Sequence, residues 1–155
     1  MKGINWFKSV IKARLPEGRS LGQEGYIRYD HPLVPGEMMV FRYDPKLKET
    51  LPIYDMFPLC IPYAKNPKGD GFYGINVHYL NPQLRRLFLE RLRRMQSHGD
   101  KVSVEELRRF ANGPGKAGLH MYLADHVDSA IWRVPHQDYK FVAGLPMAIW
   151  RGNKS

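Results

Sequence analysis

The pattern of apolar and polar residues changes from strand-like to helix-like near residue 80. Residues 37–43 and 72–80 alternate in a β-prone pattern, and residues 26–29 are a shorter strand candidate. Residues 53–63 are apolar but punctuated by prolines, which places such a strand at a sheet edge or a bulge. Period-two alternation is typical of strands. The first half of the chain therefore predicts a small antiparallel sheet.

Helical spacing dominates from residue 81 onward. Asn81 and Pro82 combine an N-cap with proline at the first helical position, and residues 103–106 form a capping box that opens a second helix. A third helix is expected at 119–129, strands at 132–134 and 145–150, and one helical turn at 135–141. The apolar stripe of the first helix consists of Leu84, Leu87, Phe88, Leu92 and Met95.

This order of elements indicates an α+β fold, because strands come first and mostly helices follow. We expect a small curved antiparallel sheet, barrel-like if it closes, followed by about three helices. Residues 1–34 predict a separate N-terminal part, a basic amphipathic helix over 4–15 and then a Gly/Pro-rich arm. Residues 35–155 predict a single α+β domain.

The charge of the chain suggests an anionic partner. It has 24 Lys and Arg against 15 Asp and Glu, a net charge of +9 and a pI of about 9.7. Such an excess favours nucleic acid, an acidic protein surface or an anionic membrane, although a basic protein without such a partner is the alternative. The single cysteine excludes a disulfide framework and a cysteine-type zinc site, and no apolar run is long enough for a transmembrane segment.

The candidate binding surface is a group of basic residues centred on the first predicted helix. Its arginines lie mainly opposite the apolar stripe, and guanidinium groups bind phosphate bidentately. A solvated helix face is the alternative reading. No signature of a sequence-specific DNA reader or an RNA-recognition module is present. The predicted surface comprises Arg85, Arg86, Arg93, Arg94, Arg108, Arg109, Lys46, Lys48, Lys65 and Lys68.

Catalytic motifs are missing from the sequence. The histidines lack the spacing of a helical zinc site, so we predict no metal and no cofactor. A nuclease needs clustered carboxylates, and the candidates Asp44, Asp55 and Asp70 are spread over the strand and turn region. His78 could act as a general base, but a hydrogen-bonded structural histidine is the commoner case. We therefore predict no catalytic residues, while nuclease activity stays open.

The middle third resembles a known protein family. The strings GEMMVFRYDPKLKETLPIYDMFPL and GFYGINVHYLNPQLRRLFLERL match three consecutive motifs of a small family from the structural gene modules of large contractile-tailed phages. The resemblance implies a DNA end protector or head-completion protein and brings no catalytic residues with it. The matching positions are Phe41, Tyr43, Pro45, Lys46, Leu51, Pro52, Tyr54, Asp55, Phe57, Pro58, Leu59, Gly71, Phe72, Gly74, Asn76, His78, Tyr79 and Leu80.

Three functions remain as hypotheses. The first is a non-enzymatic virion or assembly protein, made in the host cytoplasm, that contacts DNA through the basic helix face. The second is a structural adaptor of the neck, tail or baseplate that binds an acidic virion protein or other virion proteins, as a ring-forming oligomer or part of a hetero-assembly. The third is a metal-dependent nuclease acting on DNA ends.

Overall fold

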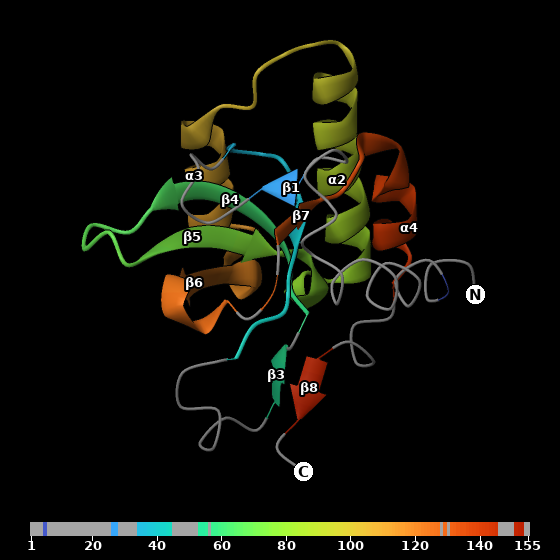
Figure 1. Ribbon diagram of the computed structural model, residues 1–155. Helices are drawn as coiled ribbons and strands as arrows, with labels where there is room; N and C mark the ends of the chain where they lie inside the picture. Colours follow the sequence, from blue (N-terminus) through green and yellow to red (C-terminus); the bar gives the residue numbers. More distant parts are fainter. Residues whose placement is uncertain are drawn as a thin grey trace.

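The computed structural model describes residues 34–44, 57–127, 129 and 131–145, together with residue 5 and the strands at 26–27, 53–55 and 151–153. Its main feature is a six-stranded sheet in the order β1-β7-β2-β4-β5-β6, with every pair antiparallel (Figure 1). The strands are β1 (Tyr26–Ile27), β2 (Met39–Val40), β4 (Leu59–Lys65), β5 (Gly71–Asn76), β6 (Leu119–Leu123) and β7 (Ile131–Arg133). Two further strands, β3 (Ile53–Asp55) and β8 (Arg151–Asn153), form a separate pair.

The predicted α+β class is confirmed. The helices are α2 (Pro82–Ser97), α3 (Val104–Asn112) and α4 (Tyr139–Ala143), and short 3-10 helices occur at η4 (Val77–Tyr79), η5 (Lys116–Gly118), η6 (Ala124–His126) and η7 (His136–Asp138). The sheet is open rather than barrel-like, because β1 and β6 end the strand order without pairing with each other. The register of β4 shifts between Pro62 and Ala64, which agrees with the bulge expected from its prolines.

Both faces of the sheet are buried, and successive residues alternate between them. Met38 and Val40 belong to one apolar cluster, whereas Met39 and Phe41 belong to the other. The same alternation separates Cys60 from its neighbours in β4. Period-two alternation thus holds, but the side chains on the two faces are apolar alike, as in a strand covered on both sides.

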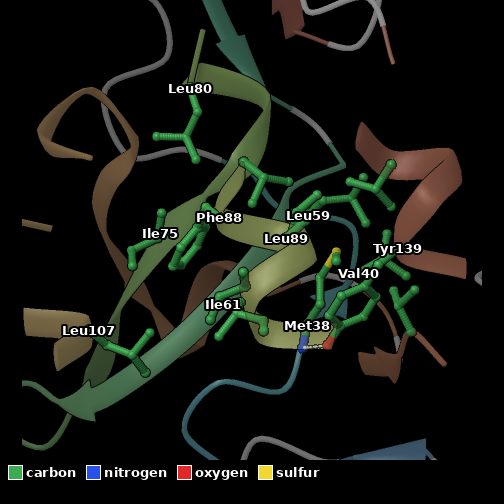
Figure 2. Close-up of a cluster of buried hydrophobic side chains, with 14 of the residues drawn as sticks. Met38, Val40, Leu59, Ile61, Ile75, Leu80, Phe88, Leu89, Leu107 and Tyr139 are labelled. Atoms are coloured by element: carbon green, nitrogen blue, oxygen red, sulfur yellow. Dashed lines mark hydrogen bonds between the residues drawn. The ribbon is translucent and has the colours of Figure 1, made fainter. Parts of the chain in front are cut away.

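The three helices cover one face of the sheet. Their buried apolar side chains all belong to the cluster that contains Met38, Val40, Leu59 and Ile61 (Figure 2). The predicted caps are in place, since Asn81 accepts a hydrogen bond from the Leu84 N–H at 2.9 Å and Ser103 accepts one from Glu106. These caps satisfy N–H groups that the first helical turn leaves free.

The apolar stripe of α2 is partly wrong in the prediction. Leu87 is 64% exposed, whereas Leu89, which the stripe omitted, is 1% exposed. The reason is tertiary, because α2 packs both on the sheet and beside α4, and this rotates its buried side toward Leu89. The core contacts of α2 therefore come from Phe88, Leu89 and Leu92.

The predicted third helix at 119–129 is also wrong. Residues 119–123 form β6, which pairs with β5, and one 3-10 turn follows. The open edge of β5 offers backbone hydrogen bonds that a helix would forgo, and Tyr122 becomes buried there. The strand at Ile131–Arg133 and the helical turn near residue 139 are confirmed.

Several predictions concern residues outside the described part of the chain. Of the N-terminal helix at 4–15, only residue 5 is described, and it is helical. The strand expected at 145–150 lies almost entirely outside the described residues. Tyr26–Ile27 of the predicted arm forms β1 at the sheet edge, while the boundary at residue 34 stays a prediction. Among the described helices, none combines the length and apolarity needed to cross a membrane.

Candidate nucleic-acid interface

Arg85 does not lie on the exposed face predicted for it. Its side chain is 2% exposed, and its Nη2 atom donates a hydrogen bond to the backbone oxygen of Leu145. Burial, together with the nearby charge of Arg86, lowers the pKa of Arg85. A guanidinium enclosed in this way cannot reach a phosphate on the surface, so we assign Arg85 to the core.

The remaining arginines of α2 leave the helix in different directions. Arg86 and Arg93 line a shallow hollow beside α4, where Lys140 joins them. Arg91 and Arg94 line a second hollow near the C-terminal end of α2, with His98 and Asp100. The sequence did not identify Lys140 as a member of the surface, because only the packing of α4 on α2 places it there.

The α3 arginines extend the second group. Arg109 and Arg91 line a groove between α2 and α3, whose floor is apolar. Arg108 does not line this groove. It pairs with Glu105 at 2.9 Å, and its charge opposes the rise that burial causes in the pKa of Tyr63 on β4. The exposed arginines of α2 and α3 thus lie on different sides of α2 and do not form one flat face.

Carboxylates on the same helices offset part of this charge. Glu90 bonds to Arg93 at 2.6 Å and approaches Arg94 at 3.8 Å, and its pKa is lowered mainly by the hydrogen bond from Arg93. Arg91 pairs with Glu106 at 3.0 Å. In the described part of the chain Arg86 and Arg109 form no ion pair. These exposed pairs are weak, so a phosphate can compete for the arginines.

The predicted lysines do not extend this surface. Lys65 and Lys68 are exposed near the β4–β5 turn, which lies at the far left of the molecule in Figure 1, well away from α2. Lys46 and Lys48 lie outside the described residues. The ten predicted basic residues therefore do not form one continuous patch within the described structure.

The glycines of the family motif allow two strands to approach closely. A Cβ atom on Gly74 would lie 2.1 Å from the Cys60 Sγ atom, and one on Gly71 would lie 2.1 Å from the Tyr122 backbone oxygen. Neither position tolerates a side chain without movement of the neighbouring strand. These motif glycines are therefore required by the sheet.

The other described motif residues are also largely structural. Phe72 is fully buried, the Tyr43 hydroxyl accepts a hydrogen bond from the Leu123 N–H at 2.9 Å, and the Asn76 side-chain amide donates to the Tyr122 hydroxyl at 3.1 Å. His78 is 0% exposed, so it is not available as a solvent-facing general base. Pro45, Leu51 and Pro52 lie outside the described residues, and Tyr54 and Asp55 are described only as β3 backbone.

The candidate carboxylates do not gather into a nuclease-like centre in the described residues. Asp70 binds the Asn66 side chain within its own turn, and Asp44 lies near His126. Among the side chains that the structure describes, no group of three or more His, Cys, Asp or Glu could hold a metal ion.

Comparison with known proteins agrees with the resemblance seen in the middle third and extends it over the chain. The family model described as phage T4 terminal DNA protecting protein matches residues 1–154. No curated protein and no solved structure matches the chain. Because the family model covers all but the last residue, the chain belongs to the phage T4 terminal DNA protecting protein family.

Proposed function

We propose that this protein binds the ends of linear phage DNA and shields them without acting on them chemically. Family membership supports the target, and the exposed arginines of α2 and α3 support the mode of contact. Residues 82–112 contain eight basic residues against four acidic ones, and all of the basic residues except Arg85 are at least partly exposed. The observation that carries the proposal is this concentration of exposed guanidinium groups on two capped, well-packed helices.

The proposed binding energy comes mainly from charge. Each arginine that meets a phosphate releases condensed counterions from DNA, and log K falls with log salt in proportion to the number of contacts. Arg86 and Arg109 are the first candidates, because no described carboxylate pairs with them. Arg93 and Arg94 can exchange the shared Glu90 for a phosphate, since a charge-assisted bidentate bond is stronger than an exposed ion pair.

The proposed protection is steric. A protein seated over a terminus occupies the position that an exonuclease needs, so no reaction by the bound protein is required. In this account the protein is made in the infected host cell and stays on the DNA ends in the virion, where it can also contact other virion proteins.

An exonuclease challenge tests the proposed function. Linear duplex DNA is incubated with the full-length protein and then exposed to an exonuclease that starts at ends. As a control for non-specific coating, nicked circular DNA is incubated with the protein in the same way and then exposed to an endonuclease. We expect slower digestion of the linear DNA and unchanged cutting of the circle. Equal digestion with and without saturating protein would contradict the proposal.

The same samples test the enzymatic alternative. Linear DNA incubated with the protein and Mg²⁺ or Mn²⁺, but no exonuclease, should stay full length. Shortening of the DNA that depends on the metal would favour a nuclease acting on ends.

A further inference from the structure

A groove between α2 and α3 combines an apolar floor with cationic edges. Its volume is about 290 Å³, and α2 contributes Phe88, Leu92 and Met95 to it while α3 contributes Leu107 and Phe110. The Phe88 and Phe110 rings stack with centroids 4.1 Å apart, which fixes the distance between the two helices at this point. The groove is therefore bounded by packed side chains of two helices.

The edges of the groove carry charges of both signs. Arg91, Arg109 and Glu106 line it, and Arg91 pairs with Glu106 at 3.0 Å. The neighbouring hollow shares Arg91 and Met95 with the groove and adds Arg94 and His98. Cationic groups thus continue from the groove along the surface of α2.

This combination fits one nucleotide better than a protein segment. A nucleotide joins a flat, largely apolar ring to an anionic phosphate, and these match the floor and the arginines respectively. The volume lies just below the range of roughly 300–1,000 Å³ typical of small-molecule pockets, which suits a single ring system rather than a docked helix.

We propose that the α2–α3 groove receives the terminal base of a DNA end after it is extruded from its base pair, with its phosphates on Arg91, Arg94 and Arg109. This inference rests on the proposed function and adds the site at which the end is recognised. A terminal base has one stacking neighbour and is extruded at lower cost than an internal base. The groove would therefore distinguish ends from continuous duplex without reading their sequence.

Fluorescence of 2-aminopurine tests the proposal. Two blunt duplexes of the same sequence carry the probe either at the terminal position or in the middle, and each is saturated with full-length protein while anisotropy confirms binding. We expect the emission of the terminal probe to change and that of the internal probe to stay constant. An unchanged terminal probe on fully bound DNA would overturn the proposal.

Two variants separate the groove from general charge. Arg109→Gln removes an exposed guanidinium at the groove, and Met95→Glu places a carboxylate within it. Arg133→Gln, on β7 and outside the groove, removes the same charge as the first variant. Both groove variants should lose the terminal response and reduce the preference for linear over circular DNA on the order of tenfold, the contribution of one stacked base. A full terminal response in folded Arg109→Gln protein would count against the groove.

The outcomes distinguish this inference from the proposed function. If the protein protects linear DNA but the emission of the terminal probe does not change, only the groove proposal is contradicted. Failure to bind or protect linear DNA would remove both. If the groove variants retained every DNA property and instead lost binding to a purified virion protein, the occupant would be a protein and the proposal would be wrong.

Discussion

Arg91 of α2 and Glu106 of α3 form an ion pair of 3.0 Å beside the groove between the two helices. The pair is largely exposed, and its members are 65% and 41% exposed in their side chains, so it contributes little to folding. In the proposed DNA interface, the pair would hold Arg91 near a carboxylate that repels phosphate.

Glu106→Gln should therefore strengthen DNA binding. The substitution removes one negative charge and frees Arg91, so we expect the affinity for linear duplex to rise roughly two- to fivefold at low salt. Fluorescence anisotropy measures the change. Glu105→Gln removes the same charge beside Arg108, outside the groove, and should change the affinity for linear duplex less. Weaker binding by Glu106→Gln would show that the carboxylate takes part in recognition.

Arg85 should affect stability and not DNA binding. Arg85→Ala leaves the Leu145 carbonyl without its donor and opens a void in the core, so the free energy of unfolding should fall by about 2–4 kcal/mol. Arg85→Met retains much of the buried volume and should bind DNA within about twofold of wild type. Arg86→Met, one position later and exposed, should lower the salt slope by about one. Equal losses of affinity in the two methionine variants would contradict this assignment.

The motif glycine Gly74 should be intolerant of alanine. The added Cβ would lie 2.1 Å from the Cys60 Sγ atom and 3.2 Å from the Ile61 backbone oxygen, so β4 and β5 would have to separate. We expect a loss of about 1–3 kcal/mol in denaturant unfolding. Gly144→Ala is the matched control, because its Cβ would meet no atom closer than 3.9 Å. A fully stable Gly74→Ala protein would mean that the strands can shift at little cost.

The buried hydroxyl of Tyr139 should make the free energy of unfolding decrease at alkaline pH. It accepts a hydrogen bond from the Met38 N–H at 3.2 Å (Figure 2), and burial raises its pKa far above the ordinary value of tyrosine. A raised pKa contributes stability that is complete below the unfolded pKa, near 10, and is lost as the pH rises above it. Unfolding measured from pH 8 to 11 should show this loss.

Tyr139→Phe should separate the two contributions of that hydroxyl. The variant leaves the Met38 N–H without this acceptor and should cost about 1–2 kcal/mol near neutral pH. Its stability should also fall less steeply above pH 10, although Tyr43 and Tyr63, whose pKa values are also raised by burial, keep part of the slope. An identical alkaline slope in wild type and variant would show that Tyr139 does not titrate as described.

Local signals in the sequence predicted the elements that depend on local chemistry. Asn81 with Pro82, and Ser103 with Glu106, mark the starts of α2 and α3 because capping involves residues within one turn. The β6 strand was missed, since residues 119–123 become a strand only by pairing with β5, which is distant in sequence. Arg85 was misplaced for a similar reason, because the packing of α4 and Leu145 decides which side of α2 is enclosed.

The candidate site was predictable only in part. Charge alone indicated the α2 and α3 arginines, and the structure places most of them on the surface. Their division around α2, the addition of Lys140 and the separation of Lys65 and Lys68 depend on tertiary packing. The motif residues were recognisable as a family marker, but their contribution to the sheet became clear only from contacts such as Gly74 with Cys60.

The salt dependence of DNA binding tests the central claim most directly. Anisotropy with linear duplex at several salt concentrations compares wild type, the triple variant Arg86→Gln, Arg93→Gln, Arg94→Gln, and a control with three exposed charges removed elsewhere, Lys65→Gln, Lys68→Gln, Arg133→Gln. We predict that the α2 variant loses about two to three units of the slope of log K against log salt, while the control changes by less than about one. Equal slopes for the α2 variant and wild type would contradict the assignment of these arginines to the DNA interface.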